Sequence, residues 1–242
     1  MKIDIWSDIA CPWCYIGLTR FERALEAFPH ADGVEVTLHS FQLDPTLPET
    51  YDGTETQYLA QRKGMPEASV REMFGHVSEA AATEGLVMDF DTLQVANSRR
   101  AHRLLHAAAS ESPATAWELK RSLLKAHFTD AESIWDADVL VRLATGAGLS
   151  EDAARAAIDS EERDAQVAAD IDAARRLGIS GVPFFVFHEK YGISGAQPRE
   201  VFTQALAQVW EEAHPRPAFE TLTIPGLQQD ATGPACGPEG CD

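Results

Sequence analysis

Two hydrophobic patterns of different period follow each other in the first part of the chain. Residues 2–6 alternate polar and apolar side chains, which is typical of a short, half-buried strand. Residues 15–28 carry an apolar stripe at steps of three and four, which predicts a helix. After an Asp-Gly turn signal at 32–33, residues 34–43 favour a second strand. The opening of the chain is therefore predicted to form one βαβ unit.

Helical periodicity then continues from about residue 55 to residue 177. The apolar run at 182–187 is too short for a globular helix and favours a strand, with 191–195 as its hairpin partner. Residues 199–213 predict a final helix, and the chain beyond 214 is rich in proline and glycine. We therefore predict an α/β fold with one open sheet, built from a βαβ half and a ββα half.

The predicted division of the chain follows these changes of pattern. Two segments form the halves of the sheet domain, a large all-helical insertion separates them, and a tail with a second cysteine pair ends the chain. The boundaries are residues 1–53 and 178–214 for the two halves, 54–177 for the insertion and 215–242 for the tail.

Charge and composition narrow the classes of function. The 242 residues include 20 Lys and Arg against 38 Asp and Glu, a formal net charge of −18. Nucleic-acid binding depends on clustered cations, so no nucleic-acid partner is expected. Asp4 and Asp8 interrupt the apolar stretch that a signal peptide needs, and no run approaches the roughly 18–20 apolar residues that span a bilayer. We therefore expect a cytoplasmic protein with no membrane partner.

The four cysteines form two close pairs, Cys11/Cys14 and Cys236/Cys241. In a reducing cytoplasm, such pairs are redox-active or metal-binding more often than permanent staples. A zinc pair usually has a second Cys or His pair nearby, and here the other pair is more than two hundred residues away. Four cysteines are acceptable zinc ligands, but the stronger expectation is that no metal is bound.

The sequence Cys11-Pro12-Trp13-Cys14 lies where the first strand is predicted to meet the first helix. Pro12 suits the first turn of a helix, where an N–H is not needed. The N-terminus of a helix stabilises a thiolate, and the thiolate is the form that attacks a disulfide. Cys11 is therefore predicted to be the more exposed, attacking cysteine, and Cys14, one turn inside, to resolve the mixed disulfide.

The second pair, Cys236 and Cys241, is separated by four residues that include two glycines and a proline. A tight loop of this kind lets the two sulfurs meet. One interpretation is an auxiliary dithiol that exchanges with Cys11 and Cys14, because a flexible tail raises the effective concentration. A surface metal clip and an inert tail are the alternatives.

Residues 6–17 (WSDIACPWCYIG) and 178–185 (GISGVPFF) resemble the thioredoxin-like superfamily, and within it the DsbA-like oxidoreductases of the FrnE type. The resemblance implies a thioredoxin-like fold that carries a helical insertion. It also implies that Pro183 follows a cis peptide bond and faces the dithiol, and that Val182 pairs with the substrate backbone. We assign Pro12 and Trp13 to the same substrate-binding surface.

One departure from the DsbA pattern concerns the residues between the cysteines. DsbA proper has a histidine there, whereas this chain has Pro12 and Trp13. A neutral indole supplies no cation to hold a thiolate. We therefore expect a less oxidising dithiol than that of DsbA, and a measured reduction potential near that of DsbA would contradict this.

The sequence thus predicts an enzyme, a thiol–disulfide oxidoreductase that acts on protein or small-molecule disulfides. An external thiol reductant resets it, and no cofactor is expected because the dithiol itself holds the electrons. One alternative on the same fold is a glutathione-dependent transferase or isomerase of the kappa-class type, whose members typically have a serine where Cys11 stands. The other is a non-catalytic redox-sensing or zinc-binding protein.

Other polar and aromatic residues near the motifs carry weaker predictions. His39 and His102 are interpreted as core or surface histidines rather than catalytic bases, since the sequence shows no partner for them. Asp8 either tunes the thiols or caps the turn before them. The aromatic residues at 6, 13 and 15 either line an apolar peptide groove or are buried.

Overall fold

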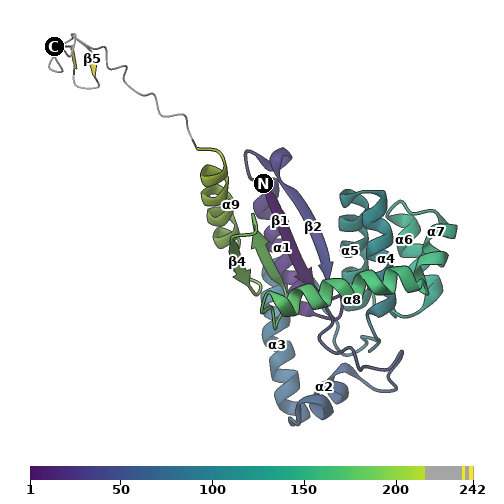
Figure 1. Ribbon diagram of the computed structural model, residues 1–242. Helices are drawn as coiled ribbons and strands as arrows, with labels where there is room; N and C mark the ends of the chain where they lie inside the picture. The colour runs from purple at the N-terminus through teal and green to yellow at the C-terminus, as the bar shows by residue number, and fades with distance from the viewer. Residues whose placement is uncertain (216–235, 238–239, 242) are drawn as a thin grey trace.

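The computed structural model describes residues 1–215, 236–237 and 240–241. The strands of its main sheet follow the order β2-β1-β3-β4 (Figure 1). β1 pairs parallel with β2 and antiparallel with β3, and β3 pairs antiparallel with β4. This mixed sheet confirms the predicted α/β, thioredoxin-like fold. The strands are β1 (Lys2–Ser7), β2 (Glu35–Ser40), β3 (Phe184–Phe187) and β4 (Tyr191–Ser194).

Helices connect the strands and fill the long segment between β2 and β3. α1 (Pro12–Glu26) joins the two parallel strands, which need a crossover connection. A 3-10 turn (Ala31–Gly33) leads into β2, and α9 (Arg199–Ala213) follows β4. Between β2 and β3 lie α2 (Glu55–Lys63), α3 (Glu67–Thr83), α4 (Arg99–Glu111), α5 (Pro113–Phe128), α6 (Ala137–Gly146), α7 (Glu151–Ile158) and α8 (Glu161–Arg176).

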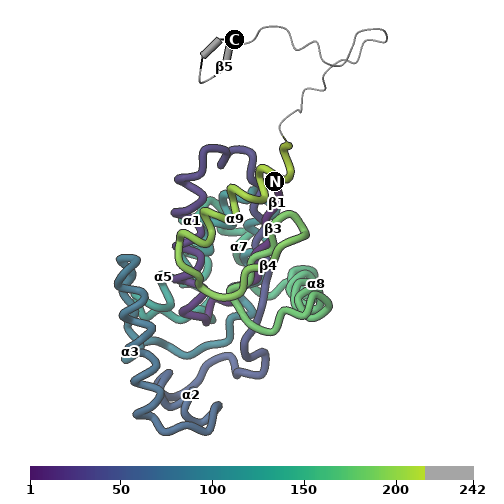
Figure 2. The backbone as a smooth tube through the Cα atoms, turned by 90° about the vertical axis from the view of Figure 1, so that its left-hand side faces the viewer, coloured from purple at the N-terminus to yellow at the C-terminus, as the bar shows by residue number. Residues whose placement is uncertain are grey.

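Side chains of β1 alternate between the two faces of the sheet. Ile3 and Ile5 are fully buried in one core with Phe21 of α1. α1 and α9 pack against each other on this face, and Figure 2 shows them side by side. Asp4 and Trp6 point to the opposite face, where α8 crosses the sheet (Figure 1). The sheet is thus a middle layer, and the last helix of the predicted insertion forms one outer layer.

The helical segment has a core of its own and also shares the core of the sheet domain. Buried side chains of α4 to α7 form one cluster. In contrast, Phe74 of α3 and Phe128 of α5 belong to the same cluster as Phe21 of α1. Packing therefore crosses the predicted boundaries at 53/54 and 177/178, and the division into domains stays a prediction.

Two strands are shorter than the hydrophobic pattern predicts. β2 ends at Ser40 rather than at residue 43, because Ser40 pairs with Ser7, the last residue of β1; beyond it, the N–H of Leu43 donates to the Asp8 carboxylate at 2.8 Å. β3 begins two residues late, because Pro183 has no N–H for the ladder. The carbonyl of Pro183 accepts the N–H of Gly195 at 2.8 Å instead. The predicted hairpin partner and final helix are confirmed as β4 and α9.

A short hairpin is described near the end of the chain. β5 (Cys236–Gly237) pairs antiparallel with β6 (Gly240–Cys241), and this register sets Cys236 opposite Cys241. The rest of the predicted tail beyond 215, and the side chains of both cysteines, lie outside the described residues. A redox role for this pair stays a prediction.

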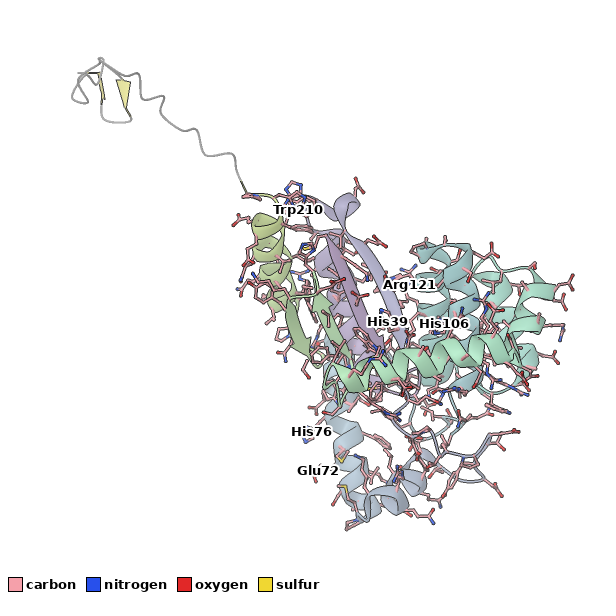
Figure 3. All side chains as sticks on the ribbon, viewed as in Figure 1. His39, Glu72, His76, His106, Arg121 and Trp210 are labelled. Carbon is pink, nitrogen blue, oxygen red and sulfur yellow. The ribbon has the colours of Figure 1, made fainter. Side chains whose placement is uncertain are left out.

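His39 of β2, labelled in Figure 3, joins the sheet to α8 through two carboxylates. Its Nδ1 lies 2.7 Å from Asp170 on α8, and its Nε2 lies 2.9 Å from Asp4 on β1. Asp170 also accepts the backbone N–H of Ser40 and lies 3.1 Å from His106 of α4. Burial lowers the pKa of His39, but the hydrogen bonds to Asp170 and Asp4 outweigh it and raise the pKa to about 9. An imidazolium therefore stands between two carboxylates.

We expect the wild-type protein to lose stability as the pH rises through about 9, relative to His39→Gln. The folded-state pKa of His39 lies above its ordinary value of 6.5, so its contribution is complete below 6.5 and is lost as the pH rises through about 9. A shift of this size corresponds to about 3 kcal/mol. Urea unfolding between about pH 6 and pH 10 measures it. His76→Gln, at an exposed position of α3, is the control. Parallel curves for wild type and His39→Gln would contradict the expectation.

Candidate active site

The first two cysteines lie on the first turn of α1. Cys11 is the N-cap residue, with an extended backbone (φ −107°, ψ 111°), and Pro12 is the first helical residue. The N–H of Cys14 donates to the carbonyl of Cys11 at 3.0 Å. Both side chains are buried, with 3% of Cys11 and none of Cys14 exposed. The predicted order of exposure is right, but the difference is small.

A loop from the far part of the chain contacts Cys11. The Cys11 thiol donates to the Val182 carbonyl, with 3.6 Å between sulfur and oxygen. The Val182–Pro183 peptide is cis, the conformation that the resemblance implied. A Cβ on Gly17 of α1 would come within 2.8 Å of Cγ of Pro183, so the loop approaches α1 this closely only because residue 17 is a glycine. The substrate-binding roles of Val182 and Pro183 stay predictions.

Gly17→Ala is expected to destabilise the protein, although alanine is the better helix former. The new methyl group has to displace Pro183, and overpacking of this kind costs about 1–3 kcal/mol. Gly75→Ala is the matched control, because Gly75 is exposed on α3 and a Cβ there meets nothing within 4 Å. The control is expected to gain about 0.5–1 kcal/mol. Thermal unfolding compares them, and equal shifts of the same sign would contradict the close approach.

The aromatic residues around the motif have different environments. Trp13, two residues after Cys11, is 39% exposed and Pro12 is half-buried; their place on a substrate-binding surface stays a prediction. Trp6 is instead buried and stacks on His39, with ring centroids 4.3 Å apart. Trp6 therefore belongs to the layer between the sheet and α8 and lines no groove. The side chain of Tyr15 is half-buried.

A carboxylate and a histidine are buried beneath the dithiol. Asp8 accepts the backbone N–H groups of Ala10 and Leu43, and it lies 3.2 Å from Nε2 of His102. Burial raises the pKa of Asp8, but the hydrogen bonds from His102 and Leu43 outweigh it and hold the pKa below its usual value. Burial lowers the pKa of His102. Asp8 thus holds the turn before Cys11, and His102 is a core histidine, as interpreted from the sequence.

Lys120 of α5 is a buried cation whose charge acts on Cys14. Only 2% of Lys120 is exposed, and its Nζ donates to the Ser7 carbonyl at 3.5 Å. Burial lowers the pKa of Lys120 to about 8, against the attraction of Cys14 and Asp8. Burial and the neighbouring Cys11 raise the pKa of Cys14 well above its usual value, whereas the charge of Lys120 lowers it. Lys120 therefore offsets part of the cost of a Cys14 thiolate.

Sequence reasoning missed Lys120, although the pattern holds a signal for it. Ala116, Leu119 and Leu123 form the buried stripe of α5, and Lys120 follows Leu119 on that same face. A lysine within an apolar stripe is rarely buried without a reason. His127, seven residues further along α5, is likewise buried, and its Nδ1 has no hydrogen-bond partner in the described part of the chain.

Two features are absent from the described residues. Among residues 1–215 and the two short strands near the end, no three His, Cys, Asp or Glu side chains are grouped as metal ligands. In the same part of the chain, no helix has the length and apolar character needed to cross a bilayer. Neither result bears on the Cys236 and Cys241 side chains, which are not described.

A mixed sheet with a CxxC pair at the start of α1, next to a cis-proline loop, is typical of the thioredoxin-fold class of proteins. The DSBA-like thioredoxin domain model matches residues 2–207. The chain belongs to this family, which is one of DsbA-like thiol–disulfide oxidoreductases.

Similar proteins come from several bacteria. A probable DsbA oxidoreductase from Streptomyces coelicolor is 40% identical, with a TM-score of 0.81, over 100% of this chain and 98% of that chain. The uncharacterized protein YwbO of Bacillus subtilis is 26% identical over 86% of this chain and 96% of its own length. The cytosolic disulfide reductase DsbM from Pseudomonas aeruginosa, solved with GSH, is 20% identical, with a TM-score of 0.63, over 87% of this chain and 100% of that chain. This last likeness is one of fold.

Proposed function

We propose that this protein is a dithiol oxidoreductase of the FrnE type, with Cys11 as nucleophile and Cys14 as resolving cysteine. The observation that carries the proposal is the position of both cysteines on the first turn of α1, with the Cys11 sulfur against the Val182 carbonyl. Family membership and the 40% identical probable DsbA oxidoreductase support it. The cytoplasmic location stays a prediction from the sequence.

The reaction consists of two exchanges of one disulfide bond. The Cys11 thiolate attacks one sulfur of the substrate, which forms a mixed disulfide and releases the first substrate thiolate. The Cys14 thiolate then attacks the Cys11 sulfur, which closes the Cys11–Cys14 disulfide and releases the second thiolate. The substrate gains two electrons from the dithiol, and an external thiol reductant then supplies two electrons that reduce the Cys11–Cys14 disulfide again. The dithiol holds the electrons, so the proposal includes no cofactor.

Substrate binding is proposed to use the surface around Cys11. Trp13 offers exposed aromatic area, and Pro12 borders it. The backbone of Val182 lies within hydrogen-bond distance of the Cys11 thiol, so an extended substrate segment paired with Val182 would present its sulfur there. Pro183 packs beneath this segment. Disulfides of proteins and of small thiols are both proposed substrates.

Reduction of insulin disulfides by dithiothreitol tests the proposed function. Wild type is expected to accelerate the reaction, and Cys11→Ser to lose the acceleration. The double variant Cys236→Ser/Cys241→Ser separates the two cysteine pairs: activity equal to wild type makes the second pair dispensable in this assay. Loss of activity in the double variant would make the tail pair part of the electron path.

Absence of turnover by wild type with any disulfide would contradict the proposal. Zinc content after purification would then distinguish a metal-binding or redox-sensing protein. Glutathione affinity would distinguish the kappa-class type of transferase or isomerase. The cysteine at position 11 disfavours that type, whose members typically have a serine there.

A further inference from the structure

A cavity of about 360 Å³ lies between the loop that precedes Cys11 and helix α2. It reaches Ala10, the residue directly before Cys11. A volume of this size suits a small molecule rather than a folded protein segment. The lining includes Asp8, Ala10, Leu43, Glu55, Tyr58 and His127.

The carboxylates of this cavity differ in how well the fold satisfies them. Asp44 accepts the Tyr58 hydroxyl at 2.6 Å and pairs with Arg62 at 2.7 Å. Asp8 is held by His102 and by backbone N–H groups. Within the described residues, Glu55 has neither a hydrogen bond nor an ion pair. Burial alone raises its pKa to about 7.

A second group in the cavity is also unsatisfied. His127 lines the wall and is 3% exposed, and among the described residues no partner bonds its Nδ1. A buried polar atom without a partner costs free energy that a ligand can recover. Glu55 from α2 and His127 from α5 therefore supply the polar groups of the cavity that the fold leaves unused.

The charge balance of the lining favours a cation. Three carboxylates line the cavity, at positions 8, 44 and 55, against the cations Arg62 and Lys63. Arg62 is paired with Asp44, and Lys63 is exposed, so water and salt screen its charge. An ammonium group placed against Glu55 favours the ionised form of its carboxyl and gains a charge-assisted hydrogen bond, whereas a carboxylate ligand there meets repulsion from the ionised form.

We propose that this cavity binds the amine-bearing half of a low-molecular-weight disulfide, with Glu55 facing its ammonium group. The inference rests on the proposed function, because the disulfide sulfur would then lie next to Ala10 and within reach of Cys11. Attack by the Cys11 thiolate forms a bond to that sulfur and releases the other half as its thiolate. Cys14 closes the protein disulfide and releases the bound half, so one disulfide yields two thiols and the dithiol is oxidised.

Two disulfides of nearly equal shape test the assignment. Cystamine carries an ammonium at each end, and bis(2-hydroxyethyl) disulfide carries a neutral hydroxyl at the same place. The full-length protein is reduced, freed of reductant and mixed with either compound. Oxidation of Cys11 is counted by mass spectrometry after quenching with iodoacetamide. The second-order rate constant of this oxidation is measured without added reductant.

In Glu55→Gln, the rate constant for cystamine is expected to fall about tenfold, the usual size of one charge-assisted hydrogen bond. The rate constants for the hydroxyethyl compound and for insulin are expected to stay as in wild type. Glu72→Gln removes one carboxylate from an exposed position of α3 (Figure 3) and is expected to change none of the three. It controls for the net charge of the protein.

The remaining outcomes separate this inference from the proposed function. Equal loss for cystamine and the hydroxyethyl compound in Glu55→Gln, or loss for neither, overturns the role of Glu55 and leaves the oxidoreductase in place. If wild type reacts no faster with cystamine than with the neutral compound, the role of Glu55 is likewise overturned and the oxidoreductase is left in place. Wild type that is oxidised by none of the three disulfides contradicts the proposed function, and the inference falls with it.

Discussion

Replacing Cys14 with serine is expected to stop the reaction at a covalent intermediate. Cys11 still attacks the substrate, but no second thiolate stands one turn away to attack the mixed disulfide. The loss of an intramolecular nucleophile is expected to lower turnover by about 100-fold or more. Intact-mass measurement after mixing with a disulfide of known mass is expected to show one adduct on the protein, which dithiothreitol removes.

Cys11→Ser is the matched control for this experiment. It keeps Cys14, which is fully buried and whose pKa burial raises well above its usual value. No adduct at Cys14 is therefore expected. An adduct on Cys14 in this variant, or wild-type turnover by Cys14→Ser, would show that the two cysteines do not divide the steps as proposed.

Lys120→Met is expected to slow the attack of Cys14 on the mixed disulfide and to make the fold more stable. The charge of Lys120 lowers the pKa of Cys14, so its removal leaves less Cys14 thiolate at a given pH. For each unit by which that pKa rises, the thiolate fraction at neutral pH falls about tenfold, and the greater nucleophilicity of the more basic thiolate reduces the net slowing to about threefold. The pH–rate profile of the step therefore moves to higher pH. Removing a buried charge without a paired carboxylate is expected to add about 1 kcal/mol or more to the free energy of unfolding.

Two variants separate this electrostatic effect from a packing effect. Lys120→Arg keeps the positive charge and is expected to retain a pH–rate profile close to that of wild type. Lys125→Met lies on the same helix, but Lys125 is exposed and bound to Asp130, so no shift of the profile is expected. A wild-type profile in Lys120→Met, with only the rate scaled down, would contradict the role of the charge.

Local sequence was sufficient to predict the frame of the site. The alternation before Cys11, the proline after it and the apolar stripe from residue 15 predict a strand, a turn and a helix, and these are β1 and α1. Each of these signals acts within a few residues, through side-chain alternation, helix capping and the fixed φ of proline. For the same reason, the pattern at 182–187 predicts a strand but misplaces its first residue.

Resemblance, rather than pattern, supplied the part of the site that comes from the far end of the chain. The hydrophobic pattern at 182–187 leaves the isomer of the Val182–Pro183 bond open, because most X-Pro bonds are trans. The cis bond and its contact with Gly17 depend on the packing of β3 against β1. The sequence around Gly17 or around Pro183, taken alone, does not predict this contact.

By itself, the sequence determined the order of the elements, the position of the dithiol on its helix and the mixed α/β class, since these depend on neighbouring residues. Only the tertiary structure decided which charged groups lose their water. Lys120 is buried next to a thiol more than a hundred residues earlier in the chain, and His39 stands between Asp4 and Asp170. A charged group is buried only where elements that are distant in the sequence pack together. The hydrophobic pattern of a single segment does not show which other segment packs against it. The position of the proposed dithiol could therefore be predicted along the chain, whereas the charged groups around it are brought together only by the fold.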